Sequence, residues 1–226
     1  MHPRTPGRPH LWLVRHAPAG LPAGEPGRLG VLGGAYNPIT LAHLAMADTA
    51  RAAFGLHEVL FLLPQAPPHK PLVGATLEQR LDMMQLAVAD RPYAAVGLCS
   101  HGLFIEIYEA LAEVYRPLPE VFFLTGRDAA ERVLTWPYDD AEAALRQMFT
   151  AFQLIVCDRN GAFVLPDDPR LAPYRHRIHR CVLPPPYRHI SSTAVRERCR
   201  QGLPIDDLVP AVVAAYIEQH RLYRNG

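Results

Sequence analysis

The stretch that decides the fold is residues 33–43, which read Gly33-Gly34-Ala35-Tyr36-Asn37-Pro38-Ile39-Thr40-Leu41-Ala42-His43. The apolar stretch 29–32 leads into it and predicts a strand, and residues 44–54 beyond it predict a helix. Paired glycines let the backbone turn tightly and approach a ligand closely. A helix that starts just after them presents unpaired N–H groups and a partial positive charge, which favours phosphate. We therefore expect a strand–loop–helix unit that grips a triphosphate.

Two side chains at the start of that helix fit the same role. Thr40 and His43 are three residues apart, so a hydroxyl and an imidazole share one face of the first helical turn. Both can donate hydrogen bonds to phosphate oxygens. An ordinary loop with a capping threonine and a surface histidine is the simpler interpretation of the same residues.

A second motif lies near the other end of the chain, where residues 190–196 read Ile190-Ser191-Ser192-Thr193-Ala194-Val195-Arg196. Serines are good helix caps, and Arg196 would lie one turn into the helix, on the side of Ser192. Hydroxyls, free N–H groups and a guanidinium at one helix start can clamp phosphate oxygens. Alone, the motif could be a simple cap. Together with the glycine loop, it predicts that two distant helix starts meet at one triphosphate.

Both motifs resemble signatures of the nucleotidylyltransferase superfamily, G-G-x-F-D-P-x-[H/T]-x-G-H and I-S-S-T-x-x-R. Asn37 stands where the superfamily usually has Asp, and Ala42 where it usually has Gly. The resemblance implies catalytic roles for Thr40, His43 and Arg196. It also implies an ATP-binding set, which comprises Gly33, Gly34, Ala35, Tyr36, Ile190, Ser191 and Ser192.

Three further stretches narrow the resemblance, namely residues 67–70, residues 125–136 and residues 216–223. In order and spacing they are similar to the bacterial nicotinate-mononucleotide adenylyltransferases, over residues 29–224. By this resemblance Gly126 and Asp128 would meet the ribose of ATP. The acceptor would be bound by three side chains, His69, Lys70 and Trp136, with the indole stacked on the pyridine ring. Residues 100–111 depart from the family, which usually carries a Tyr-Thr pair there.

The resemblance implies transfer of AMP from ATP to nicotinate mononucleotide, with release of pyrophosphate, in NAD biosynthesis. Mg²⁺ would arrive with ATP and bridge its phosphates largely through water, so no protein metal site is expected. One alternative is another nucleotidylyltransferase, with phosphopantetheine or nicotinamide mononucleotide as acceptor. Another is a catalytically silent nucleotide sensor, which Asn37 and Ala42 would fit.

Composition is that of a globular cytoplasmic protein. Of 226 residues, 49% are hydrophobic and 20% charged, and the formal net charge is +1. Such a balance gives no sign of a surface for nucleic acid or membrane. The four cysteines are widely spaced and do not suggest a metal site. No apolar run approaches the ~20 residues of a membrane span. Nothing in the composition opposes a homo-oligomer.

The first 28 residues differ from the rest, because they are rich in Pro, Arg and Gly. Residues 13–16 read Leu-Val-Arg-His, like the nucleophile motif of histidine phosphatases. The remaining chain carries another set of motifs, which argues against that chemistry. We expect an arm over 1–28, either a strand added to a sheet edge or partner, or a partly ordered segment. Residues 29–226 would form a single domain.

Apolar periodicity along 29–226 alternates between strand and helix. The expected strands are 29–32, 59–63, 94–98, 121–124, 152–157 and 180–183. The expected helices are 43–54, 76–89, 103–115, 128–134, 140–148, 192–201 and 210–220. This alternation predicts an α/β fold, a doubly wound, mostly parallel sheet with helices on both faces, of the Rossmann-like nucleotidylyltransferase type. Ligands in such folds bind beyond the carboxyl ends of the strands, where all the motifs fall.

Overall fold

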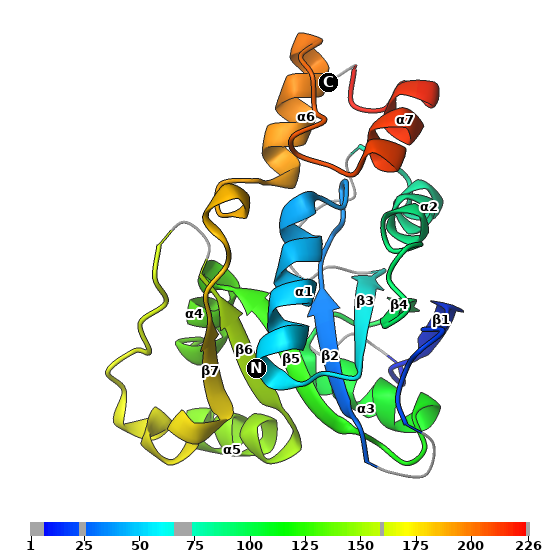
Figure 1. Cartoon of the computed structure of the whole chain (residues 1–226). Coiled ribbons are helices and arrows are strands. Elements are labelled where there is room, and N and C mark those ends of the chain that lie inside the picture. Colours follow the sequence, from blue (N-terminus) through cyan, green and yellow to red (C-terminus); the bar gives the residue numbers. More distant parts are fainter. Residues whose placement is uncertain (1–6, 23–25, 66–73, 159–160, 225–226) are drawn as a thin grey trace.

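The computed structural model describes residues 7–22, 26–65, 74–158 and 161–224. At its centre is a seven-stranded sheet in the order β1-β4-β3-β2-β5-β6-β7 (Figure 1). The strands are β1 (Leu11–Arg15), β2 (Arg28–Gly33), β3 (Glu58–Pro64), β4 (Ala94–Cys99), β5 (Glu120–Gly126), β6 (Gln153–Cys157) and β7 (Ile178–Cys181). All neighbouring pairs from β4 to β7 are parallel.

The helices follow the strands along the chain, as the alternation predicted. They are α1 (Leu41–Phe54), α2 (Leu77–Ala87), α3 (Phe104–Val114), α4 (Arg127–Leu134), α5 (Ala141–Ala151), α6 (Ser192–Gln201) and α7 (Ala211–Gln219), with short 3₁₀ helices η1 (Pro169–Arg177) and η2 (Pro185–Tyr187). None of the helices in these described segments combines the length and the apolar character that crossing a bilayer demands.

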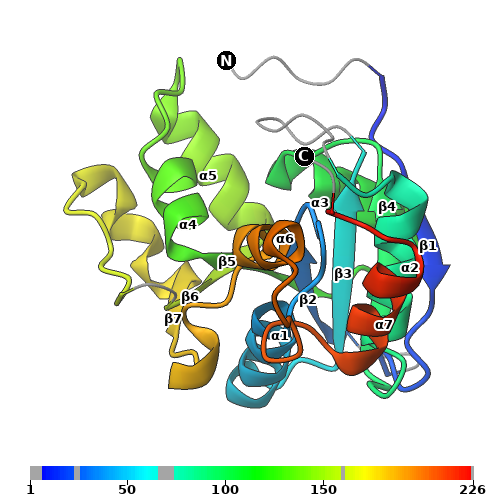
Figure 2. The same cartoon turned by 90° about the horizontal axis from the view of Figure 1, so that it is seen from above.

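The helices cover both faces of the sheet, which confirms the doubly wound fold (Figure 2). One buried cluster joins the sheet to α1, α2, α6 and α7, through side chains such as Met46, Met83, Val195 and Ile217. The opposite cluster joins it to α3, α4 and α5. Because parallel strands are buried on both faces, β3 is a nearly continuous apolar run.

The sheet extends on both sides of β2, and this determines where a ligand can bind. From β2 the sheet continues through β3 and β4 on one side and through β5, β6 and β7 on the other. Leu32 of β2 pairs with Leu124 of β5, so the glycines that end these strands, Gly33 and Gly126, lie at the same edge. A reversal of strand order of this kind opens a crevice at the carboxyl ends, where ligands of doubly wound sheets bind.

The N-terminal segment supplies the edge strand β1, which pairs antiparallel with β4. Leu11 is buried in the sheet's core, whereas Trp12 and Val14 are exposed, as the alternation of side chains in an edge strand requires. From the sequence, the arm could be either an added strand or a partly ordered segment. Residues 11–15 of the arm form a strand at the edge of the sheet.

Several boundaries differ from the sequence-based expectation, those of α1 and β7 among them, and neither 3₁₀ helix was expected. α1 starts at Leu41, two residues early, because Thr40 is its N-cap rather than a residue of its first turn. β7 begins at Ile178 instead of residue 180. The 3₁₀ helix η1 occupies a proline-rich stretch that we expected to be loop. Its start is stabilised by the Asp168 carboxylate, which accepts from the backbone N–H of Arg170 at 2.9 Å.

Candidate active site

The loop between β2 and α1 lies at the crevice and is shaped by its glycines and by Tyr36. Gly33 is exposed, and a Cβ at this position would meet no atom within 4 Å. The backbone N–H of Gly34 donates to the carbonyl of Leu62 at 3.1 Å. Tyr36 has a φ of 41° and turns its ring into the core, where its hydroxyl donates to the Leu32 carbonyl. Burial raises the pKa of Tyr36, so the phenol stays neutral.

Thr40 and His43 form a capping arrangement at the start of α1. The backbone N–H of Thr40 donates to Nδ1 of His43 at 3.1 Å, and the Thr40 hydroxyl lies 2.8 Å from the same atom. Because a backbone N–H can only donate, Nδ1 accepts, and the neutral ring carries its proton on Nε2. The His43 ring also packs against Tyr36, with 5.1 Å between ring centroids. Thr40 is fully buried, so its hydroxyl lies behind His43.

The start of α6 is bonded directly to this loop, which brings together motifs more than 150 residues apart. Ser192 Oγ donates to the carbonyl of Pro38 at 2.8 Å. Arg196 Nη1 donates to the carbonyl of Asn37 at 2.8 Å, and its Nη2 lies 3.2 Å from the Thr193 hydroxyl. The two helix starts therefore meet above the carboxyl edge of the sheet, as Figure 1 shows for α1 and α6.

The other residues of the second motif build the helix start itself. Ser191 is the N-cap of α6, and its Oγ accepts from the backbone N–H of Ala194 at 3.1 Å. Ile190 is buried and anchors the chain just before the cap. The hydroxyls of both serines are thus engaged within the protein. The groups at this helix start that are suited to phosphate are its first backbone N–H groups and the guanidinium of Arg196.

The end of the neighbouring strand β5 leads into three of the residues that sequence similarity assigned to adenosine and acceptor, namely Gly126, Asp128 and Trp136. Gly126 closes β5, and a Cβ there would also meet no atom within 4 Å. Asp128 lies in the first turn of α4, with its side chain 77% exposed and 3.5 Å from Arg127. Trp136 lies two residues beyond α4 and is half-buried. His69 and Lys70 lie outside the described residues.

Arg80 contacts the glycine loop, a contact that we did not predict from the sequence. It is 2% exposed, and its Nε donates to the carbonyl of Ala75 at 2.8 Å. Its Nη1 lies 3.3 Å from the carbonyl of Ala35 in the glycine loop. Burial lowers the pKa of Arg80 from its usual value. Its position in the helix gave a signal, since it shares the buried face of α2 with Met83 and Met84.

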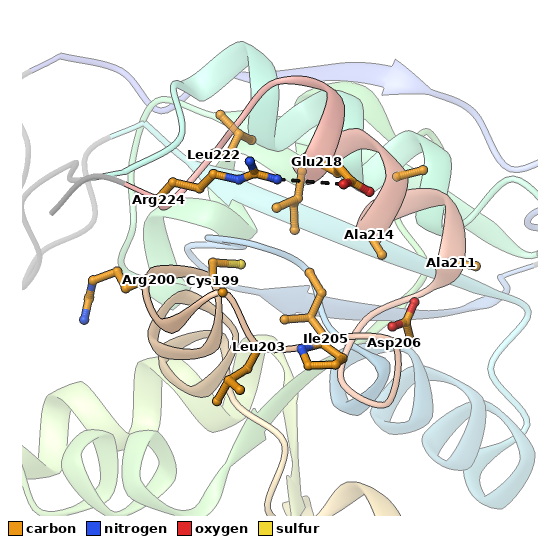
Figure 3. Close-up of a pocket in the computed structure, with 14 residues that line it drawn as sticks. Cys199, Arg200, Leu203, Ile205, Asp206, Ala211, Ala214, Glu218, Leu222 and Arg224 are labelled. Carbon is orange, nitrogen blue, oxygen red and sulfur yellow. Dashed lines mark ion pairs between the residues drawn. The ribbon is translucent and has the colours of Figure 1, made fainter.

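A cavity of about 800 Å³ opens between α6 and α7 (Figure 3), beside the loop site rather than within it. Its lining comes from the end of α6, the turn after it, α7 and the C-terminal segment, and includes Cys199, Ile205, Leu222 and Arg224. It contains none of the site residues that the sequence predicted.

This fold and this loop geometry define a nucleotide-binding α/β protein of the nucleotidylyltransferase type. Comparison with protein families matches residues 31–198 to the family described as cytidylyltransferase-like. The chain belongs to this family and is a nucleotidylyltransferase.

Relatives narrow the class to nicotinate-nucleotide adenylyltransferases, a group of which the chain is a member. A probable nicotinate-nucleotide adenylyltransferase of Moorella thermoacetica is 36% identical over 88% of this chain and 93% of its own. A probable nicotinate-nucleotide adenylyltransferase of Bordetella pertussis is 33% identical over 87% of this chain and 98% of its own. The solved nicotinic acid mononucleotide adenylyltransferase of Plasmodium falciparum, complexed with APC, shares the fold with a TM-score of 0.67. It is 16% identical and covers 88% of this chain and 98% of its own.

Proposed function

We propose that this protein transfers AMP from ATP to nicotinate mononucleotide and releases pyrophosphate, a step of NAD biosynthesis. The observation that carries the proposal is the bonding of the α6 start to the glycine loop, through Ser192 and Arg196. This bonding joins two helix starts that are suited to phosphate at the strand-order reversal of the sheet. Relatives named for this activity, 31–36% identical over nearly their full length, support the choice of acceptor.

The chemistry requires no covalent enzyme intermediate. The acceptor phosphate attacks the α-phosphorus of ATP in line, and pyrophosphate leaves from the opposite side. Catalysis then rests on positioning and on stabilising the charge that builds on the phosphate oxygens. His43 would donate from Nε2 to those oxygens. Thr40, buried behind the ring, would act through His43 by holding Nδ1 as an acceptor.

The α6 start would hold the leaving pyrophosphate. Its first backbone N–H groups point along the helix axis, and Arg196 adds a positive charge next to them. We assign Ser191 and Ser192 to shaping this helix start, because their hydroxyls are already engaged with Ala194 and Pro38. Within the glycine loop, the backbone from Gly33 to Tyr36 would lie along the triphosphate.

The α4 side of the crevice would take the remaining parts of both substrates. Gly126 and Asp128 would meet the adenosine ribose, and Trp136 would stack on the pyridine ring of the acceptor. His69 and Lys70 would neutralise the acceptor phosphate. We propose Mg²⁺ as a partner of ATP. Its ligands would be the phosphates of ATP and water, because Mg²⁺ prefers oxygen ligands and keeps several waters.

We also propose a cytoplasmic location. The reaction consumes ATP, and the four cysteines are free thiols, as is usual for proteins of a reducing compartment.

The test of function is pyrophosphate release with ATP, Mg²⁺ and a panel of acceptors. The panel contains nicotinate mononucleotide, nicotinamide mononucleotide and phosphopantetheine. We expect release with nicotinate mononucleotide, and a dinucleotide product by mass spectrometry. Turnover only with one of the other acceptors would replace the proposed substrate. ATP binding without turnover on any acceptor would make the protein a nucleotide sensor.

A further inference from the structure

The last described residues of the chain touch the glycine loop, and none of the functions above uses them. Tyr223 is buried, and its hydroxyl donates to Oδ1 of Asn37 at 2.9 Å, across 186 residues of sequence. Oδ1 also lies 3.3 Å from the backbone N–H of Ala75. One amide oxygen in the loop therefore binds both the C-terminal segment and the segment that leads into α2.

The backbone on either side of this contact is held in unusual conformations. Tyr223 has a φ of 63°, in the left-handed region, which is uncommon for a residue with a side chain. Gly74 has a φ of 91°, and a Cβ there would lie 3.1 Å from the Asn37 amide and from the Tyr223 ring. Both backbones are thus shaped so that the tyrosine, the asparagine and Gly74 pack together closely.

The neighbours of Tyr223 point elsewhere, which identifies the tyrosine as the contact of this segment with the loop. Leu222 and Arg224 line the cavity between α6 and α7 (Figure 3). The C-terminal segment therefore runs between that cavity and the glycine loop. Tyr223 alone of these three residues bonds to Asn37.

The loop carbonyls around Asn37 are held from other directions as well. Arg80 donates toward the carbonyl of Ala35, and Arg196 donates to that of Asn37 itself. Each bond fixes the backbone of this loop, which leads into α1, the helix that carries His43. A displacement of a fraction of an ångström in this loop would move both the backbone at Gly33 and the imidazole, and catalysis depends steeply on such placement.

We infer that Asn37 and Tyr223 are positioning residues of the nucleotide site, and that the C-terminal segment holds the loop 34–40 in its ATP-binding conformation through their hydrogen bond. The inference rests on the proposed ATP-binding role of this loop. The role of Asn37 is to accept the hydrogen bond from Tyr223. An aspartate at this position could do the same, since either side chain supplies an acceptor oxygen.

The test is a double-mutant cycle with Tyr223→Phe and Asn37→Leu, each of which removes one partner of the hydrogen bond at nearly constant size. The matched control is Tyr216→Phe, because the Tyr216 hydroxyl donates to Asp82 at 2.8 Å and ties α7 to α2 without touching the loop. Asn37→Asp retains the acceptor and serves as the conservative rescue. Two quantities are measured, the Kd of a non-hydrolysable ATP analogue and the hydrogen-exchange rates of loop amides 34–41.

We expect Tyr223→Phe to weaken analogue binding about fivefold, the effect of losing one hydrogen bond. Asn37→Leu should weaken it at least as much, because it also removes the acceptor of the Ala75 N–H. Both variants should speed exchange of the loop amides. The double variant should be no weaker than the worse single one, because both changes remove the same bond. Tyr216→Phe and Asn37→Asp should stay within twofold of the unmodified protein. Independent, multiplying losses, or unchanged exchange in Tyr223→Phe, would overturn the inference.

These readouts separate the inference from the proposed function. Neither analogue binding nor hydrogen exchange requires an acceptor. A protein that binds the analogue but turns over no nicotinate mononucleotide would refute the proposed reaction and leave the cycle interpretable. If the unmodified protein does not bind the analogue at all, both the ATP-binding role and the inference fail.

Discussion

Thr40 donates its backbone N–H to Nδ1 of His43 across 3.1 Å and thereby binds the imidazole to the helix start that it caps. The bond has two effects. It satisfies one of the N–H groups that a helix start leaves unpaired, and it leaves the ring proton on Nε2. The His43 side chain therefore both stabilises the start of α1 and would donate to the phosphates. A substitution that keeps the first role and removes the second tests them separately.

His43→Gln is that substitution. Glutamine at the third helical position can accept from the cap N–H as the imidazole does, so thermal stability should change little. Turnover should fall on the order of 10²-fold, because an amide N–H at a different position replaces the imidazole Nε2–H that would donate to the developing phosphate charge. His43→Ala should show the same loss of turnover and, in addition, lose about 1 kcal/mol of stability. Steady-state kinetics and thermal unfolding of both variants check this. Retained turnover in His43→Gln would remove the imidazole from catalysis.

Gly33→Ala tests how closely the nucleotide approaches the loop. The added Cβ meets no protein atom within 4 Å, and Gly33 does not have a positive φ, so folding and the melting temperature should be unaffected. If the triphosphate lies against this backbone, the methyl group will occupy its place and raise the Kd of an ATP analogue at least about tenfold. Calorimetric titration measures this. Gly126→Ala is a parallel case at the neighbouring strand end, and unchanged binding in both variants would place the nucleotide elsewhere.

Trp136→Ala tests the acceptor side. A ring that stacks on the acceptor's pyridine should weaken acceptor binding by about 1 kcal/mol or more. KM for the acceptor should rise at least about fivefold, with KM for ATP nearly constant. Trp136→Phe should recover most of the loss, since it restores a ring. Tyr138→Phe is a control from the same turn, because the Tyr138 hydroxyl donates only to the Val133 carbonyl at 3.0 Å. Equal losses for both substrates would assign Trp136 a structural role.

The sequence predicted the strand–loop–helix unit and the α6 start because their signals are local. Glycines, caps and apolar periodicity act within a few residues, so the two motifs could be placed on their elements correctly. Thr40 was harder, because the cap position that buries it depends on the packing of α1 against the sheet. The bond between Asn37 and Tyr223 spans 186 residues and follows no periodic pattern, so only the folded chain reveals it.

Asp158 provides a test of stability against pH. Its carboxylate is buried at the end of β6 and accepts from Nε and Nη2 of Arg180, at 2.8 and 2.6 Å, and from the backbone N–H of Phe163. These donors hold the pKa of Asp158 below its ordinary value. A depressed pKa means that the contribution is present above the unfolded-state value, about 3.9 for Asp, and is lost as pH falls through the folded-state value.

Asp158→Asn should therefore lower the free energy of unfolding by about 2 kcal/mol near pH 7, and the difference should shrink as pH falls below the unfolded-state value, about 3.9, and through the lower folded-state value. Denaturant unfolding from pH 7 to pH 2.5 measures it. Asp207→Asn is the control, because that carboxylate also pairs with an arginine but is 61% exposed, and exposed pairs contribute little. A pH-independent deficit in Asp158→Asn would show that the charge is not what stabilises the contact.

Arg196→Lys separates the two tasks of the arginine, which donates to the Asn37 carbonyl and would also meet the pyrophosphate. Lysine keeps the positive charge but lacks the planar fork that can bind the loop and a phosphate together. We expect kcat to fall on the order of 10-fold to 100-fold, with a melting temperature close to that of the unmodified protein. Arg198→Lys, on the same helix but paired with Asp207, should retain full turnover. If Arg196→Lys is as active as the unmodified protein, a point charge suffices and the bond from the guanidinium to the Asn37 carbonyl is not required for catalysis. A loss confined to KM for ATP would instead limit Arg196 to substrate binding, because transition-state stabilisation must appear in kcat.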